Sequence, residues 1–309
     1  MATRLKGRPP EEVKPGRIKG VLFGPPGSGK TWAALSFPAP FYVDSEGGAD
    51  LAHYQKRLKE SGGAYFGPSD GALDFDDIIG QVDALATEKH GYKTLVIDSL
   101  SRPFWSLAAR EQERLGEKDA FGAYKKLPLQ KARKLISHLE RLDMNVWLVC
   151  HEIAVWEGSG GERREIGRGP DVGWDKIPYE LHLVLQAKQL GKDIREAVVW
   201  KSRLTGFPTG DRFYLQDKGK DVAYANFTER YQRDFIEAEA KPIVLATEEE
   251  VAEIRRLLEI VKVPEEETAK WLTKANVESF EEMTGAQALA VIAFLDKKMA
   301  KPTLAGKAS

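Results

Sequence analysis

Short apolar runs alternate with amphipathic stretches over the first half of the chain. Runs that are almost entirely apolar predict buried strands, and apolar residues that recur every three or four positions predict helices. The predicted strands are 18–23, 41–43, 94–97 and 145–150, and the predicted helices are 30–36, 75–88 and 129–142. Such alternation is typical of an α/β fold in which a mainly parallel sheet is flanked by helices.

The pattern changes after residue 157. A segment rich in Gly and Arg, 157–173, predicts a loop. Beyond it, apolar runs separated by glycines predict antiparallel strands and hairpins added at the sheet edge. These runs are 181–186, 197–200 and 212–215.

A small helical domain is predicted at the C-terminus. Thr247 with Glu250, and Thr284 with Gln287, have the spacing of capping boxes, which open helices by satisfying free backbone amides. With a helix over 265–274 between them, residues 247–300 form a three-helix unit. The remaining expected segments are a Pro-rich basic arm (1–16), a core (17–236), a linker (237–246) and a flexible tail (301–309).

Composition suits a globular protein, with 42% hydrophobic residues in 309. The apolar runs are far shorter than the roughly 20 residues that span a bilayer, and the N-terminus is charged, so no membrane association is expected. The one cysteine, Cys150, ends an apolar run and is expected to be buried. A single cysteine excludes an internal disulfide.

Charge is balanced overall, at a net −1, but not locally. Residues 102–134 carry nine basic and four acidic side chains, and residues 1–19 carry six basic and two acidic ones. Residues 247–300 carry twelve acidic and seven basic side chains. Any nucleic-acid contact is therefore expected in the core, while the acidic C-terminal domain is a candidate for a protein partner. A solvated face is the plain alternative for each run.

One motif matches Gly-x-x-x-x-Gly-Lys-Thr between a predicted strand and a predicted helix. In this context the glycines let backbone amides surround phosphate oxygens, Lys30 bridges the β- and γ-phosphates, and Thr31 supplies a hydroxyl ligand to Mg²⁺. The sequence therefore predicts a P-loop that binds ATP and Mg²⁺. Its residues are Gly24, Pro25, Pro26, Gly27, Ser28, Gly29, Lys30 and Thr31.

Asp98 ends a predicted buried strand, which places a carboxylate beside the P-loop as a Walker B residue holding magnesium. Enzymes of the AAA+ class have a catalytic Glu directly after this Asp, whereas Ser99 follows it here. The segment Asp44-Ser45-Glu46 resembles the Asp-Ala-Glu of the RecA family, in which the Glu is catalytic. The resemblance implies that Glu46 activates water and that Asp44 is structural; a solvated turn is the alternative.

Two further matches are to RecA-like proteins. The strand containing Lys201 and Arg203 resembles the Lys-x-Arg strand of hexameric helicases of the DnaB type, whose cations reach the γ-phosphate on a neighbouring subunit. The resemblance implies a homo-oligomer, a ring or a filament; the alternative is that both residues lie on a solvent face. His151 follows a strand where RecA-like proteins have a phosphate sensor, and Glu152 is a second candidate for positioning water.

Over roughly 17–225 this order of motifs resembles phage nucleotide-binding proteins of the Sak-four kind, which are RecA-like single-strand annealing proteins. The resemblance implies a RecA-like P-loop core and DNA-contacting loops at 101–126 and 157–176. Basic and aromatic side chains there suit phosphate contact and base stacking, although acidic residues offset those of the second loop. The DNA-binding candidates are Arg102, Trp105, Tyr124, Lys125, Lys126, Arg163, Arg164 and Arg168.

Three functions are compatible with these residues. The first is a DNA-stimulated ATPase that promotes annealing or strand pairing on single-stranded DNA in phage-type recombination. The second is a ring-forming DNA helicase or translocase. The third is a nucleotide-dependent regulatory switch with protein partners. In each case a cytoplasmic location is expected, in the host cell if the protein is phage-encoded.

Overall fold

The computed structural model describes residues 16–116, 122–158, 162 and 164–299. The chain divides into two compact units. The first takes Met1–Asp70, Tyr92–Arg102 and Met144–Glu239, and the second takes Gly71–Gly91, Pro103–Asp143 and Ala240–Ser309. The expected basic arm lies outside the described residues except for Gly16, and the expected tail 301–309 lies wholly outside them.

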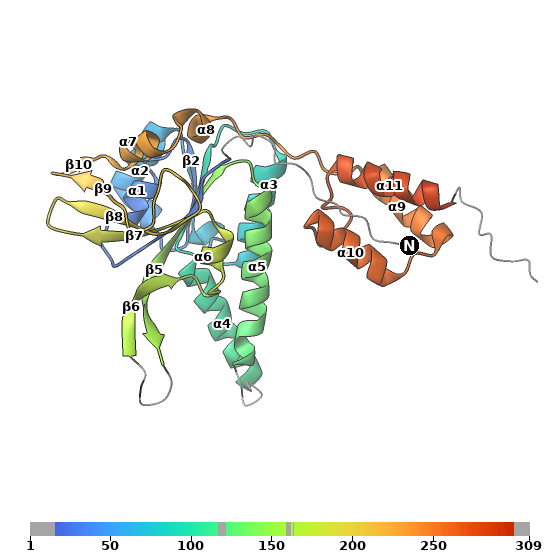
Figure 1. The fold of residues 1–309 in the computed structure, drawn as a ribbon, viewed down its shortest axis with the longest axis horizontal. Helices are drawn as coiled ribbons and strands as arrows, with labels where there is room; N and C mark the ends of the chain where they lie inside the picture. The colour runs from blue at the N-terminus through green and yellow to red at the C-terminus, as the bar shows by residue number, and fades with distance from the viewer. Residues whose placement is uncertain (1–15, 117–121, 159–161, 163, 300–309) are drawn as a thin grey trace, which may run out of the picture. The chain divides into compact units, whose positions relative to one another are not determined.

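The first unit is built on a ten-stranded sheet of order β10-β9-β8-β7-β1-β5-β4-β2-β3, with β6 paired to β5 (Figure 1). Strands β1 to β5 and β7 run parallel to one another, and β6, β8, β9 and β10 pair antiparallel. The mixed α/β class predicted from the sequence is confirmed. The strands are β1 (Lys19–Phe23), β2 (Pro40–Asp44), β3 (Ala64–Phe66), β4 (Thr94–Asp98), β5 (Asn145–Glu157), β6 (Arg164–Asp171), β7 (Leu183–Gln189), β8 (Arg195–Ser202), β9 (Arg212–Asp217) and β10 (Lys220–Asp221).

Helices belong to both units. Those of the first unit are α1 (Lys30–Ala34), α2 (Ala52–Ser61), α6 (Ile177–Glu180), α7 (Ala223–Arg230) and α8 (Arg233–Glu237). Those of the second are α3 (Phe75–Thr87), α5 (Lys126–Arg141), α9 (Glu248–Val261), α10 (Glu265–Ala275) and α11 (Gly285–Met299), and α4 (Ser101–Leu115) begins in the first unit and continues in the second. Short 3-10 turns are η1 (Gly48–Asp50), η2 (Pro68–Asp70) and η4 (Ala123–Lys125).

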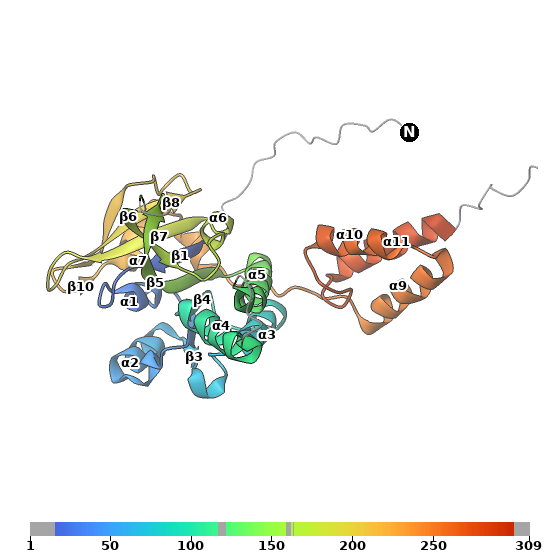
Figure 2. The same cartoon turned by 90° about the horizontal axis from the view of Figure 1, so that it is seen from below.

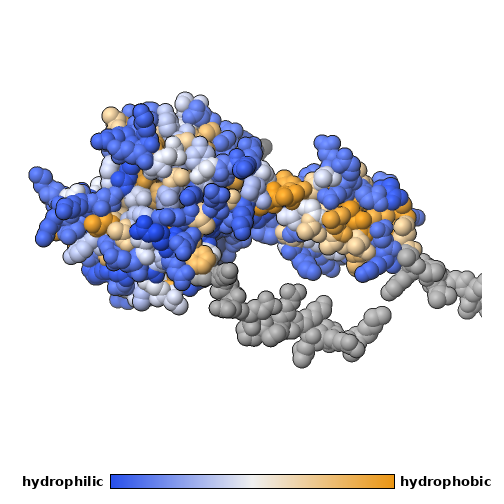
Figure 3. All heavy atoms as spheres, turned by 90° about the horizontal axis from the view of Figure 1, so that it is seen from above, coloured by the Kyte–Doolittle hydropathy of each residue, from blue (hydrophilic) through white to orange (hydrophobic). Residues whose placement is uncertain are grey.

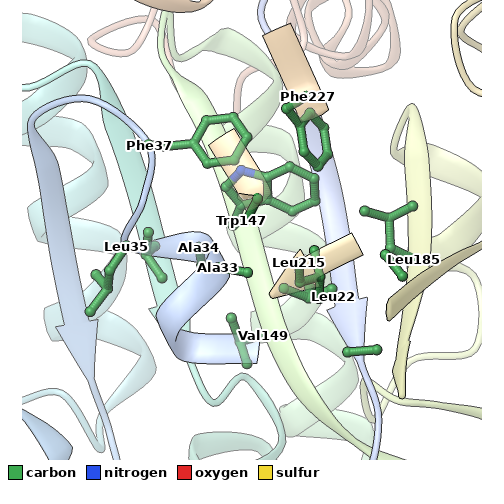
Figure 4. Close-up of a cluster of buried hydrophobic side chains, with 14 of the residues drawn as sticks. Leu22, Ala33, Ala34, Leu35, Phe37, Trp147, Val149, Leu185, Leu215 and Phe227 are labelled. Atoms are coloured by element: carbon green, nitrogen blue, oxygen red, sulfur yellow. The ribbon is translucent and has the colours of Figure 1, made fainter. Parts of the chain in front are cut away.

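The core of the first unit is centred on Trp147 of β5. Every residue of β1 and β4 is buried, as expected for strands covered on both faces. Phe37 and Phe227 lie beside the Trp147 indole with ring centroids 5.3 Å from it, and Figure 4 shows the three rings together. Truncating Trp147 to alanine should cost about 3–5 kcal/mol, because the neighbouring rings could fill the space only in part.

The prediction of a loop over 157–173 was wrong for residues 164–171, which form β6. Strand β5 continues past Cys150 to Glu157 and pairs with β6, so that the two extend from the sheet as a ribbon (Figure 1). In its register Ile153 faces Gly169 and Val155 faces Gly167. Two of the glycines that suggested a loop thus lie opposite apolar residues of the partner strand, a pairing that a local pattern does not reveal.

Two other expectations need correction. The strand predicted over 181–186 as an antiparallel edge addition is β7, which pairs parallel with β1 and antiparallel only with β8. Most of the expected DNA-contacting loop over 101–126 is helix α4, in which Phe104 is fully buried. Its apolar residues recur at helical spacing, and burial of that face outweighs the loop expected from the resemblance.

The C-terminal helices α9, α10 and α11 appear as three rods in Figure 2. Both capping boxes are confirmed: Thr247 and Glu250 exchange bonds of 2.9 and 3.2 Å, and Thr284 and Gln287 exchange bonds of the same lengths. Hydrophobic side chains gather on the surface of these helices (Figure 3, right). Ile260 of α9 is one of the large hydrophobic residues that are about half exposed. Within the described part of the chain, no helix has the length and apolarity needed to cross a membrane.

Candidate nucleotide site

The P-loop turns tightly between β1 and α1, as its sequence predicts. Gly24 has φ of 151°, and a Cβ atom there would lie 2.3 Å from the carbonyl oxygen of Ala187 on β7. Gly29 has φ of 85° and opens α1. Only glycine adopts such backbone angles without strain, and Gly24 has in addition no room for a side chain. The motif therefore has the compact backbone that phosphate binding requires.

Lys30 folds back across the loop. Its Nζ donates hydrogen bonds of 2.9 Å to the carbonyl oxygens of Gly24 and Pro25. Burial lowers the pKa of Lys30, and the negative charges of Asp98 and Glu46 oppose that effect. The ammonium thus lies within the loop where the β- and γ-phosphates of a nucleotide would bind.

Thr31 and Asp98 meet at the carboxyl end of the sheet. The Thr31 hydroxyl donates to Oδ2 of Asp98, and Asp98 is 6% exposed. Burial raises the pKa of Asp98 to about 6, while the Thr31 hydrogen bond and Lys30 lower it. A hydroxyl beside a carboxylate fits Mg²⁺, which takes oxygen ligands and completes its shell with waters and phosphate oxygens. Among the described residues, no group of three or more His, Cys, Asp or Glu side chains could hold a metal by itself.

Asp44 and Glu46 differ in their surroundings. Asp44 is fully buried and accepts hydrogen bonds from the backbone amides of Glu46, Gly47 and Ala49 at 3.1, 3.0 and 2.6 Å. It holds the turn after β2, which matches the structural part expected of it. The Glu46 side chain is 41% exposed, and its Oε1 lies 2.8 Å from Nε2 of His151 at the end of the buried part of β5.

The structure therefore brings two sequence candidates, Glu46 and His151, into direct contact. Both lie at the carboxyl ends of parallel strands that flank β4, the strand that ends at Asp98. Glu152, the second candidate for positioning water, is the next residue of β5, and its charge also raises the pKa of Lys30. Three acidic groups thus act on the P-loop lysine from neighbouring strand ends.

Lys201 and Arg203 lie toward the amino ends of strands β1 and β7, whereas the P-loop lies at the carboxyl end of β1. Lys201 pairs with Val184, three residues before Ala187, whose carbonyl packs on Gly24. Three residues span about 10 Å of strand, so the Lys201 backbone lies about that far along the sheet from the start of the P-loop. Lys201 donates to the carbonyl oxygen of Leu181 and Arg203 to that of Tyr179. Burial and the charge of Arg203 lower the pKa of Lys201.

Arg195 is a cation at the P-loop that the sequence did not indicate. Its Nε donates to the carbonyl oxygen of Gly27 at 2.9 Å, and its Cδ would lie 2.8 Å from a Cβ atom on Gly29. Because β8 runs antiparallel to β7, the start of β8 lies at the P-loop edge and its end, with Lys201, lies away from it. The sequence indicated Lys201 at the end of β8, but the pairing with β7 that brings the start of β8 to the P-loop is a property of the tertiary structure.

Of the DNA-binding candidates, three come together in the second unit. Lys125 Nζ lies 5.3 Å from the centroid of the Trp105 ring and 5.5 Å from that of Tyr124. The neighbouring Lys126 begins α5. Trp105 is 38% exposed, Lys126 is exposed and Lys125 is partly exposed.

The remaining candidates lie in the first unit. Arg102 is exposed in the first turn of α4. Arg164 and Arg168 lie on β6, where they form ion pairs with Glu157 at 3.0 Å and Glu165 at 3.2 Å. Strands β5 and β6 together carry two arginines and four acidic residues, so the ribbon has no net positive charge. Arg163 lies outside the described residues.

Comparison with known proteins gives one family match. The sequence matches the AAA domain family, AAA_24, over residues 17–213. Solved structures similar to the chain include the crystal structure of the RadB recombinase, at 19% sequence identity and a TM-score of 0.42, covering 65% of this chain and 88% of that chain. None of the curated proteins matches it. Because the family match spans well over half of the chain and includes the P-loop, Glu46, Asp98 and His151, the chain belongs to the AAA domain family and has its P-loop nucleotide-binding core.

Proposed function

We propose that this protein hydrolyses Mg·ATP and uses the reaction on single-stranded DNA, in annealing or strand pairing of the phage recombination type. The observation that supports hydrolysis is the Glu46–His151 contact next to the Thr31–Asp98 pair. A carboxylate held by an imidazole, one strand away from the magnesium ligands, has the position of a group that activates water.

Each group at the site has a separate role in the reaction. Lys30 and the P-loop amides hold the phosphates, and Thr31 and Asp98 hold Mg²⁺, which when bound neutralises charge on the phosphate oxygens. The Glu46 carboxylate accepts a proton from water as the water oxygen bonds to the γ-phosphorus. The bond between that phosphorus and the bridging oxygen breaks, and ADP and phosphate leave. His151 orients Glu46 through its Nε2.

Single-stranded DNA is proposed as the partner because of the Trp105–Tyr124–Lys125 cluster. Aromatic faces stack on unpaired bases, and lysines release counterions from phosphates. Within the described residues 16–116, 122–158, 162 and 164–299, no ion pair is formed by Lys125 or Lys126, whereas Arg164 and Arg168 on β6 each pair with a glutamate. Basic character in this cluster, rather than on the β5–β6 ribbon, makes it the preferred DNA contact.

The test is the ATPase rate with and without single-stranded DNA. Stimulation that requires Lys30, with Lys30→Ala inactive under both conditions, supports the proposal. A rate indifferent to DNA would instead favour the regulatory switch, in which the hydrophobic surface of α9 to α11 contacts a protein. Processive unwinding of duplex DNA would select the helicase.

The position of Arg203 favours an oligomer with ATP at subunit interfaces. Arg203 lies away from its own P-loop, so the nucleotide on which it acts is the one bound by a neighbouring subunit. Head-to-tail contacts of that kind generate rings or filaments. Arg203→Ala should bind ATP but turn it over on the order of 10³-fold more slowly. Mixing it with Lys30→Ala should restore part of the activity, because some interfaces then combine an intact P-loop with an intact Arg203. Mixed oligomers as inactive as either parent would contradict the shared site.

A further inference from the structure

A cavity of about 310 Å³ adjoins the P-loop and extends beyond it. It shares Gly27, Gly29 and Thr31 with the loop. Its size falls within the roughly 300–1,000 Å³ of small-molecule sites. The cavity therefore adjoins the place where the phosphates of a nucleotide would lie. The other lining residues are Trp32, Ala33, Tyr54, Arg195, Leu215 and Gln216.

One wall of the cavity is aromatic. The rings of Trp32 on α1 and Tyr54 on α2 lie 6.0 Å apart, and the Arg57 guanidinium lies 4.2 Å from the Trp32 centroid on the ring face. Arg57 is in turn paired with Asp221. Such a stack holds the indole in place without a ligand, so the wall is preformed.

The guanidinium of Arg195 also lines the cavity. Its Nε and Nη1 donate to the carbonyl oxygens of Gly27 and Lys192 at 2.9 and 3.1 Å, which fixes the plane of the group. Gln216 faces Arg195 across the β8–β9 pairing and also lines the cavity. A planar guanidinium stacks on aromatic rings, and a glutamine amide both donates and accepts hydrogen bonds.

We propose that this cavity binds the nucleoside part of the nucleotide, with the base stacked on the Arg195 guanidinium and its edge within reach of the Gln216 amide. The inference rests on the proposed function, since it requires the triphosphate to lie in the P-loop. The inference goes beyond the proposed function because it assigns a ligand selectivity to the site. A triphosphate that carries an aromatic base binds more tightly than a bare polyphosphate. Arg195 is then a specificity-determining residue on the base, while Lys30 acts on the phosphates.

Equilibrium binding of two probes, Mg·ATP and Mg·tripolyphosphate, tests this assignment. Arg195→Ala should weaken ATP binding by about 5- to 150-fold, the range of a base stack, and leave tripolyphosphate binding unchanged. Arg195→Lys keeps the charge but loses the planar face, so it should also weaken ATP selectively. Arg212→Ala is the matched control, because it removes an arginine four residues from Gln216 on the same strand and outside the cavity.

The outcomes of these measurements separate the inference from the proposed function. Equal weakening of both probes by Arg195→Ala would place Arg195 on the phosphates and overturn the inference, as would wild-type protein that binds tripolyphosphate as tightly as ATP. If Arg195→Ala melts well below wild type, Gln216→Ala provides the second measurement, and unchanged discrimination among ATP, GTP and UTP in that variant overturns the inference. Protein that binds ATP selectively through Arg195 but never hydrolyses it refutes the proposed function and leaves this inference standing. Protein that binds neither probe refutes both.

Discussion

Replacing Asp98 by asparagine should make the protein more stable at neutral pH in the absence of magnesium and nucleotide. Asp98 is 6% exposed, and burial raises its pKa from an ordinary 3.8 to about 6. Above the higher value the side chain is charged in both the folded and the unfolded state, and the folded state bears the cost of burying that charge. Asparagine keeps an oxygen that accepts the Thr31 hydrogen bond and removes the charge.

The magnitude follows from the two pKa values. A difference between 3.8 and about 6, at roughly 1.4 kcal/mol for each pH unit, corresponds to ~3 kcal/mol. Since the folded-state pKa is raised, the wild type has its full stability below pH 3.8 and loses this contribution as the pH rises through about 6. The stability gap in favour of Asp98→Asn should therefore grow from ~1 kcal/mol near pH 4.5 to ~3 kcal/mol near pH 7.5.

Urea unfolding of both proteins at these two pH values, without Mg²⁺ or nucleotide, measures the gap. Asp175→Asn serves as the control, since Asp175 is exposed and its replacement should change stability by less than about 0.5 kcal/mol at either pH. Mg·ATP should then stabilise the wild type and not Asp98→Asn, because the carboxylate is a magnesium ligand. A gap that is absent or independent of pH would refute the explanation by burial, and a variant stabilised equally by Mg·ATP would remove Asp98 from the metal site.

Three further predictions concern the other sites. Lys30→Ala should abolish ATP binding, whereas Glu46→Gln should bind ATP normally and lose on the order of 10²–10⁴-fold in turnover, measured by equilibrium binding and phosphate release; near wild-type turnover in Glu46→Gln would exclude Glu46 as the base. Reversing the charge at Lys125 and Lys126 should weaken binding to single-stranded DNA and flatten its dependence on salt, and binding indifferent to both changes would remove these residues from the DNA site. Deleting 247–309 should leave the basal ATPase rate intact, because every proposed phosphate and magnesium ligand lies upstream; a folded but inactive truncation would make the C-terminal helices part of the catalytic unit.

The sequence by itself determined the local features of this protein. The P-loop residues, Asp98 at the end of a buried strand and the two capping boxes each depend on neighbours within a few positions, so their spacing was sufficient. Alternation of apolar and amphipathic stretches likewise gave the α/β class, since burial imposes a period on each element separately.

Only the tertiary structure decided which elements pair. Partners in a sheet are distant in the chain, and the apolar pattern of a strand does not name its neighbour. Strand β7 pairs parallel with β1 and antiparallel with β8. These pairings place Arg195, at the start of β8, beside the P-loop and Lys201, near its end, toward the amino end of β1. The Glu46–His151 contact likewise joins residues more than 100 positions apart. Local spacing and resemblance gave the candidate residues of the site one by one, whereas the position of Arg195 and the contacts between the candidates arise from long-range strand pairing.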